Sequence, residues 1–180
     1  MTDLYVTWSE YHRLIEQLVV QVWDSGYRID SLLCLARGGL RVGDVFSRVY
    51  DLPLGILAAS SYREAAGTRQ GELDIAEFIT MTGGGLHGNL LLVDDLVDSG
   101  ATLTRVIVHL KQRFAAVSEL RTAVLWHKGC STYQPDFFVQ QLPTSPWIHQ
   151  PFEEYDSLRP NHLAARLRGK ARSAEPPSDG

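Results

Sequence analysis

Residues 90–102 read LLLVDDLVDSGAT, and this stretch decides the fold. An apolar run leads directly into the carboxylates Asp94 and Asp95, Asp98 follows, and an apolar pattern with helical spacing then continues to Phe114. A short strand without polar alternation is typical of a parallel sheet that helices cover on both faces. Ligands bind such sheets beyond the carboxyl ends of the strands. The stretch therefore predicts a strand, a ligand-binding loop and a helix.

The loop also indicates what kind of ligand it binds. Ser99, Gly100, Ala101 and Thr102 offer backbone N–H groups and two hydroxyls at a helix N-terminus, which suits a phosphate dianion. The acidic pair cannot face that phosphate, because like charges a few ångströms apart repel by roughly several kcal/mol. Hydroxyl groups or a cation must lie between them. A ribose 5-phosphate, with Mg²⁺ nearby, satisfies both halves of the loop.

Two other interpretations of the stretch compete with this one. A flavodoxin-like receiver also places an acidic pair at strand ends, and Lys128 would then be its partner, but a receiver does not explain residues 99–102. Alternatively, the strand is simply buried, and Asp98 or Ser99 caps the following helix.

The rest of the chain shows the same succession of elements. A capping box at Thr7–Glu10 opens an amphipathic helix that Gly26 ends. Apolar runs predict strands at 31–35, 53–59, 76–81, 120–126 and 137–139, and helical patterns cover 42–50, 103–114 and 158–167. We expect an α/β fold with a doubly wound, mainly parallel central sheet flanked by helices. Residues 1–165 should form a single domain, and 166–180 a disordered tail.

Composition narrows the class of protein. The chain has 180 residues, 44% of them hydrophobic, and a net charge of −4, so no basic field favours nucleic acid. Cys34 and Cys130 lack the spacing of a zinc site or a disulfide framework. No apolar stretch approaches the length of a membrane span, and no basic leader precedes one. We expect a cytoplasmic protein with no nucleic acid or membrane partner.

Residues 90–102 resemble the phosphoribosyl pyrophosphate signature of the type I phosphoribosyltransferases, which is an apolar run, two acidic residues, a spacer and Asp-Ser/Thr-Gly-x-Thr. Two further segments resemble the same family. Arg37 and Gly38 follow the first strand and match its pyrophosphate loop. Ser61-Tyr62 matches the pair that precedes a mobile loop, here about 62–74, which closes over the reaction centre in that family.

Two segments resemble the 6-oxopurine members in particular. Lys128 stands where a lysine donates to the oxygen on purine C6. Residues 143–157, with the N-terminal segment, resemble the small hood of bacterial xanthine-guanine phosphoribosyltransferases. There Trp147 would stack on the base, while the backbone at Ile148 and the carboxylate of Glu153 would read its C2 side. Three positions depart from that pattern: Gly129 replaces a common proline, His149 an acidic residue, and Glu153 an aspartate.

The resemblance implies a homo-oligomeric, Mg²⁺-dependent purine salvage enzyme. It would transfer ribose 5-phosphate from 5-phosphoribosyl 1-pyrophosphate to guanine, xanthine or hypoxanthine. Asp94 and Asp95 would hold the ribose hydroxyls, Asp95 also the metal, and Asp98 would act as general base beside purine N7. Two alternatives remain open. One is a regulator of the same fold that binds RNA or a nucleotide with little catalysis, and the other is a pyrimidine phosphoribosyltransferase.

Overall fold

The computed structural model describes residues 3–61 and 73–173, without the side chains of residues 60, 61, 73 and 169–173. The chain divides into two compact units. The larger is His12–Pro146, and the smaller combines Met1–Tyr11 with Trp147–Gly180.

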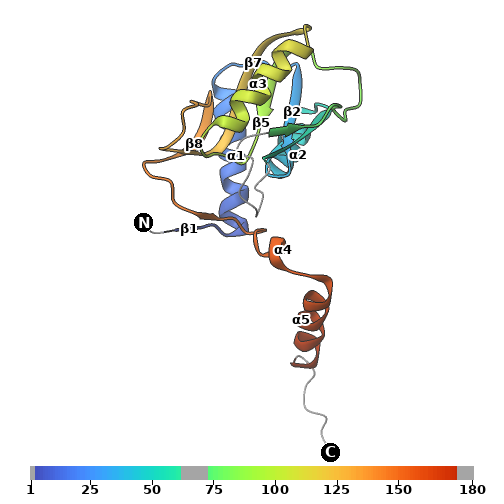
Figure 1. Ribbon diagram of the computed structural model, residues 1–180, viewed down its shortest axis with the longest axis vertical. Helices are drawn as coiled ribbons and strands as arrows, with labels where there is room; N and C mark the ends of the chain where they lie inside the picture. Colours follow the sequence, from blue (N-terminus) through green and yellow to red (C-terminus); the bar gives the residue numbers. More distant parts are fainter. Residues whose placement is uncertain (1–2, 62–72, 174–180) are drawn as a thin grey trace, which may run out of the picture. The chain divides into compact units, whose positions relative to one another are not determined.

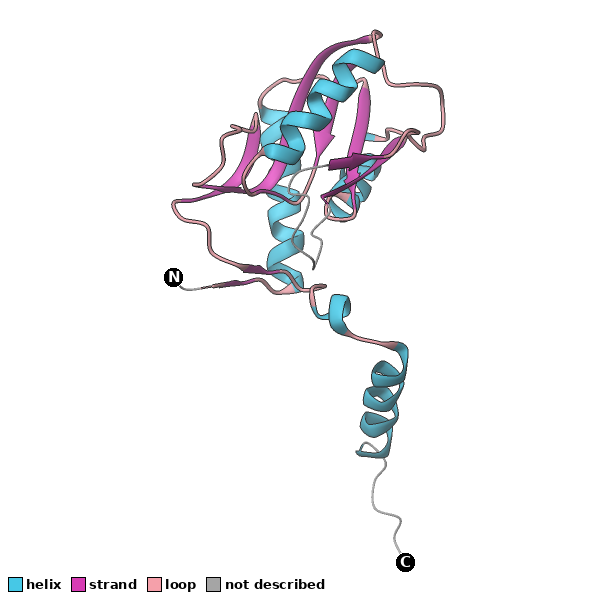
Figure 2. Cartoon of the chain, in the orientation of Figure 1, coloured by secondary structure: helices cyan, strands magenta, loops and turns pink. Residues whose placement is uncertain are grey.

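The larger unit is built on a mostly parallel sheet (Figures 1 and 2). Its strands are β2 (Ser31–Ala36), β3 (Leu54–Ser61), β4 (Leu73–Ile75), β5 (Gly88–Val93), β6 (Leu96–Val97), β7 (Val117–Lys128) and β8 (Phe137–Leu142). The order is β4-β3-β2-β5-β7-β6, with β8 also paired to β7. Only the pair of β3 with the edge strand β4 is antiparallel. The predicted fold class is confirmed.

Strand side chains alternate between the two faces of this sheet, and each face packs against its own helix. Leu33, Leu90 and Leu92 join a buried cluster with α3 (Ala101–Arg113). On the other face α2 (Leu40–Tyr50) approaches β2 so closely that a Cβ on Gly43 would lie 2.8 Å from the Cβ of Cys34. Figure 1 shows α3 in front of the strands and α2 behind them. Apolar residues are needed on both faces, which explains the uninterrupted apolar runs.

The first helix, α1 (Trp8–Asp24), begins as the capping box predicts. The Glu10 carboxylate accepts the Thr7 N–H at 2.9 Å, and the Glu10 N–H donates to the Thr7 hydroxyl at 3.2 Å. Tyr11, Ile15 and Leu18 are buried along one side of the helix. None of the helices in the described ranges is long and apolar enough to cross a membrane.

The smaller unit is held by a short parallel pair and by aromatic contacts. β1 (Leu4–Tyr5) pairs with β9 (Ile148–His149), and two helices follow, α4 (Glu154–Ser157) and α5 (Pro160–Ser173). The ring of Phe152 meets Tyr11 edge-on at 5.5 Å between centroids and lies 6.2 Å from that of Trp8.

The expectations of a strand at 76–81 and of disorder from residue 166 were wrong. Within the described residues, the segment 76–81 hydrogen-bonds to β3 through the Ala76 N–H and a bridge between Thr80 and Ile56, and Phe78 is 74% exposed. The edge strand is instead Leu73–Ile75, and the loop expected at about 62–74 lies mostly outside the described residues. Helix α5 continues to Ser173, into the expected tail, because residues 166–172 are rich in helix-forming Arg, Leu, Lys and Ala.

Candidate active site

The candidate site lies at the carboxyl ends of the neighbouring strands β2 and β5, from which the chain continues toward opposite edges of the sheet. From β2 the chain passes through α2 to β3, whereas from the neighbouring β5 it passes through α3 to β7, on the other side. The loops that follow β2 and β5 therefore lead to helices on opposite faces of the sheet. Such a switch point is where open α/β sheets bind ligands. Arg37-Gly38 follows β2, and Asp94-Asp95 follows β5.

These two loops come into direct contact through glycine. A Cβ on Gly38 would lie 2.5 Å from Asp95 Oδ1, and one on Gly39 would lie 2.6 Å from the Val93 carbonyl oxygen. Real side chains do not approach this closely, so the contact requires both glycines. The peptide bond between Ala36 and Arg37 is cis, and the Arg37 side chain is exposed. The structure thus brings the predicted pyrophosphate loop and the acidic pair together.

The acidic pair is electrostatically strained. The Asp95 N–H donates to Asp94 Oδ1 at 2.9 Å, and the Leu96 N–H donates to Asp95 Oδ1 at 2.8 Å. Burial raises the pKa of Asp94 well above its usual range, and the adjacent Asp95 carboxylate raises it further. Both residues are intermediate between buried and exposed. A cation or a set of hydroxyl donors would relieve this repulsion.

Asp94 and Asp95 suit Mg²⁺ only when a bound ligand supplies further oxygen atoms. Within the described residues no group of three or more acidic, histidine or cysteine side chains is arranged to hold a metal. Mg²⁺ commonly binds one or two carboxylates and completes its shell with water and substrate phosphates. Asp94 and Asp95 fit that pattern, because two oxygen-donor side chains are adjacent in the loop that follows β5.

The predicted phosphate loop opens α3. Gly100 precedes the helix with φ 86° and makes no side-chain cap hydrogen bond. The Ser99 hydroxyl accepts from the Ala101 N–H at 3.4 Å, so the capping interpretation holds in part for Ser99. The other first-turn N–H groups lack intrahelical acceptors, as at every helix start, and Ser99 and Ala101 are exposed. The Ser99 carbonyl accepts from the Thr132 N–H at 3.0 Å and the Thr132 hydroxyl at 3.1 Å, which anchors the loop.

Asp98 is placed by strand β6, which sequence reasoning missed. This two-residue strand pairs with the end of β7 through Leu96↔Trp126 and Val97↔His127. The pairing brings Asp98 to Lys128, the buried last residue of β7, with 3.5 Å between Oδ1 and Nζ. The Cys130 thiol donates to the same carboxylate oxygen at 3.4 Å. No pattern in the sequence pointed to Cys130 as a neighbour of Asp98.

The residues expected to bind the base in the smaller unit form a network among themselves. Trp147 is 51% exposed, and its Nε1–H donates to Glu153 Oε1 at 2.6 Å. His149 Nδ1 lies 3.0 Å from Glu153 Oε2. Ile148 is buried between them in β9. Of the predicted loop pair, Ser61 ends β3, and Tyr62 lies outside the described residues.

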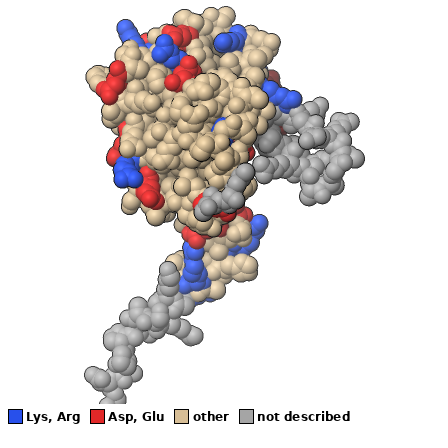
Figure 3. Space-filling model, turned by 90° about the vertical axis from the view of Figure 1, so that its left-hand side faces the viewer, with Lys and Arg blue, Asp and Glu red and all other residues tan. Residues whose placement is uncertain are grey.

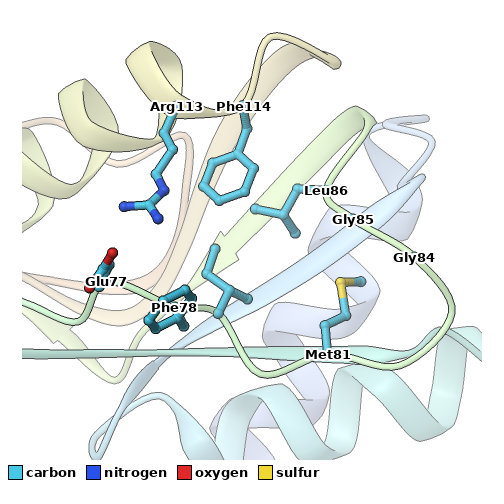
Figure 4. Close-up of a pocket in the computed structure, with 9 residues that line it drawn as sticks. Glu77, Phe78, Met81, Gly84, Gly85, Leu86, Arg113 and Phe114 are labelled. Carbon is cyan, nitrogen blue, oxygen red and sulfur yellow. The ribbon is translucent and has the colours of Figure 1, made fainter.

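A separate hollow lies at the opposite edge of the sheet, near the amino ends of β5 and β7. Figure 4 shows Arg113 and Phe114 reaching from the end of α3 toward Glu77 and Phe78, with Leu86 beside them. Its lining is largely apolar and holds no acidic pair.

Surface charge gives no sign of a nucleic acid partner on the face shown in Figure 3. Acidic and basic side chains of the larger unit are scattered there around a broad uncharged area. A nucleic-acid-binding face would be dominated by Lys and Arg.

Comparison with known proteins decides the family. Residues 7–157 match the phosphoribosyl transferase domain. The chain belongs to the phosphoribosyl transferase domain family. The matched residues include the Arg37-Gly38 loop, the acidic pair and the loop that opens α3.

Individual relatives agree with this family. A xanthine-guanine phosphoribosyltransferase from Ruegeria sp. (strain TM1040) is 25% identical over 164 residues, covering 83% of this chain and 84% of the relative. A purine phosphoribosyltransferase from Pyrococcus horikoshii Ot3 superposes with a TM-score of 0.69 at 28% identity, over 88% of this chain and 99% of the other. A xanthine-guanine-hypoxanthine phosphoribosyltransferase from Helicobacter pylori gives 0.71 at 26% identity, over 93% and 99%.

Membership in the phosphoribosyl transferase family also removes the receiver interpretation. The parallel strands run β3-β2-β5-β7-β8, which is the order of a flavodoxin-like sheet, so strand order alone did not separate the two. Residues 99–102 and the match to the phosphoribosyl transferase domain separate the two interpretations.

Proposed function

We propose that the protein is a 6-oxopurine phosphoribosyltransferase. It transfers ribose 5-phosphate from 5-phosphoribosyl 1-pyrophosphate to N9 of guanine, xanthine or hypoxanthine. The bond from ribose C1 to the pyrophosphate oxygen breaks, the bond from C1 to purine N9 forms, and pyrophosphate leaves. The observation that carries the proposal is the contact of Gly38 with Asp95, together with the exposed residues Ser99 and Ala101 at the start of α3.

Each of the loops at this edge of the sheet takes one part of the donor. The N–H groups and hydroxyls of residues 99–102 bind the 5-phosphate. Asp94 and Asp95 accept hydrogen bonds from the ribose hydroxyls, which offsets the burial and the repulsion by Asp95 that raise the pKa of Asp94. The Arg37 guanidinium and the Gly38 backbone bind the pyrophosphate. As pyrophosphate departs, the acidic pair stabilises the positive charge that develops on the sugar.

Mg²⁺ would be held by Asp95 together with oxygens of the donor. When bound, it neutralises the pyrophosphate charge and acts as a Lewis acid on the leaving group. Neighbouring Asp94 adds negative charge that favours the cation at this position.

Asp98 and Lys128 act on the purine ring. The Asp98 carboxylate accepts a proton at N7 as N9 bonds to the sugar. The Lys128 ammonium has three donors, so it keeps its 3.5 Å contact with Asp98 and donates to the oxygen on C6 as well. Because adenine carries an amino group at that position, this donor favours 6-oxopurines.

Trp147 is the residue that we assign to stacking on the purine. Half of the Trp147 side chain is exposed, and a flat ring against a purine contributes roughly 1–3 kcal/mol. The two relatives whose names include xanthine and guanine support a purine as the acceptor.

A base panel tests this function. The protein is incubated with Mg²⁺, 5-phosphoribosyl 1-pyrophosphate and one base, and nucleotide formation is followed by chromatography. We expect nucleotide from guanine, xanthine or hypoxanthine, and at least about a hundredfold less from adenine or uracil. Formation from uracil alone would indicate a pyrimidine enzyme. No nucleotide from any base would favour a regulator of the same fold.

A further inference from the structure

The turn that follows β7 packs directly against the loop that carries Asp98. The first and last residues of this turn are Lys128 and Ser131, and the Ser131 N–H donates to the Lys128 carbonyl at 3.0 Å. A Cβ on Gly100 would lie 2.9 Å from the Ser131 hydroxyl, so turn and loop are in contact. The turn thereby brings its third residue, Cys130, next to Asp98.

The Cys130 thiol reaches two atoms of the same residue. Its Sγ lies 3.4 Å from Asp98 Oδ1 and 3.6 Å from the Asp98 carbonyl oxygen. A thiol is a weak donor. A donor that lies within reach of both the side chain and the backbone of one residue nevertheless favours one rotamer of that side chain. The contact therefore limits the directions in which the Asp98 carboxylate points.

The two oxygen atoms of the Asp98 carboxylate have different surroundings. Oδ1 lies 3.4 Å from Cys130 Sγ and 3.5 Å from Lys128 Nζ. No hydrogen bond or ion pair from the described part of the chain reaches Oδ2. The Asp98 side chain is 51% exposed, so it is not sealed in the core. The carboxylate is thus held through one oxygen atom, and the other is left for a substrate.

We propose that Cys130 is a positioning residue, which together with Lys128 holds Oδ1 of Asp98 so that Oδ2 accepts the purine proton. The inference rests on the proposed function, in which Asp98 accepts the proton at N7. Proton transfer requires the accepting oxygen to lie about 3 Å from the atom that gives up the proton. A carboxylate whose direction is already fixed reaches this geometry more often. Cys130 acts through Asp98 and does not touch the substrate.

A merely structural role for Cys130 would act on the phosphate loop instead. The same turn anchors Ser99, whose carbonyl oxygen accepts from the Thr132 N–H at 3.0 Å and from the Thr132 hydroxyl at 3.1 Å. Both bonds remain when the Cys130 thiol is removed, so the loop should keep its shape. A disordered loop would raise the KM for 5-phosphoribosyl 1-pyrophosphate, whereas a misdirected Asp98 lowers kcat.

The first test measures kcat and KM for three variants, with the base that the wild type uses best. Cys130→Ala removes the donor, Cys130→Ser keeps one, and Ser118→Ala changes an exposed residue at the other end of β7. We expect kcat to fall about fivefold in Cys130→Ala, the scale of one weak hydrogen bond. In Cys130→Ser and Ser118→Ala kcat should stay within about twofold of wild type, and in all three variants so should the KM for 5-phosphoribosyl 1-pyrophosphate.

A double-mutant cycle then shows whether Cys130 acts through Asp98. In Asp98→Asn the side chain no longer accepts a proton, so its exact direction matters less. Adding Cys130→Ala to Asp98→Asn should therefore change the residual kcat by less than about 1.5-fold. A structural role gives the same fall in kcat in both backgrounds.

Three results would overturn the inference and leave the proposed function intact. They are a kcat of Cys130→Ala within about twofold of wild type, an equal fall in both backgrounds, or a Cys130→Ser variant as slow as Cys130→Ala. If the wild type forms nucleotide from guanine, xanthine and hypoxanthine alike at no measurable rate, the proposed function fails, and the inference fails with it.

Discussion

The ammonium of Lys128 lies 3.5 Å from Asp98 Oδ1, although the two residues are 30 positions apart in the sequence. The short strand β6 creates this proximity by pairing with the end of β7. This contact joins Asp98, which is proposed to accept the purine proton, to Lys128, which is proposed to donate to the oxygen on C6. One carboxylate thus connects the phosphate loop to base recognition.

Replacing the carboxylate tests this link. Asp98→Asn keeps the size of the side chain but removes its capacity to accept a proton, so we expect kcat to fall by roughly 10²–10⁴-fold with an unchanged melting temperature. Steady-state kinetics and thermal unfolding measure the two effects. Asp44→Asn, at an exposed ion pair on α2, should alter neither. Wild-type turnover in Asp98→Asn would remove the residue from the mechanism.

The contact of Gly38 with Asp95 predicts a selective loss of activity. In Gly38→Ala the new Cβ would lie 2.5 Å from the Asp95 carboxylate, which must move away. We expect kcat/KM for 5-phosphoribosyl 1-pyrophosphate to fall at least about tenfold, while the free energy of unfolding changes by less than about 1 kcal/mol. Gly85→Ala is the matched control, because nothing lies within 4 Å of its added Cβ. Equal activity in the two variants would contradict the proposed geometry.

The raised pKa of Asp94 predicts how stability depends on pH. Between the ordinary Asp pKa of 3.8 and the higher pKa of the folded state, the folded protein holds a proton that the unfolded chain has lost. Wild-type stability therefore declines as pH rises through that window. Asp94→Asn avoids this decline, so in metal-free buffer at neutral pH it should be more stable by on the order of 1 kcal/mol.

Urea unfolding of both proteins at several pH values checks this prediction. The advantage of Asp94→Asn should shrink as pH falls toward 3.8. A variant that is less stable than wild type at neutral pH, or a difference that does not vary with pH, would show that burial does not penalise this carboxylate.

The two cysteines should differ in reactivity. Cys130 is exposed, whereas burial, with a further contribution from Asp94, raises the pKa of the Cys34 thiol to about 12. Iodoacetamide should therefore modify Cys130 and spare Cys34 in the folded protein, as peptide mass spectrometry would show. Because the adduct sits beside Asp98, turnover should fall with modification, and Cys130→Ala should be insensitive. Modification of Cys130 without loss of turnover would contradict the placement.

The central features of the fold were predictable because strands that are buried on both faces of a sheet appear in the sequence as uninterrupted apolar runs. The run Leu90–Val93 has no polar residue, and the acidic pair and glycine loop follow it directly. The capping box at Thr7 was equally local. In each case, residues adjacent in sequence determine the structure.

Features that depend on pairing between distant segments were not predictable. Strand β6 contains only Leu96 and Val97, too few residues for any periodicity, so the approach of Asp98 to Lys128 and Cys130 was invisible. The alternation at 76–81 predicted a strand, but only Thr80 bridges to β3.

The most direct test is a crystal structure of the protein with 5-phosphoribosyl 1-pyrophosphate and Mg²⁺. The account predicts the 5-phosphate on the N–H groups of residues 99–102, the ribose hydroxyls on Asp94 and Asp95, and the pyrophosphate beside Arg37 and Gly38. A donor bound elsewhere, or one whose ribose does not touch the acidic pair, would contradict it.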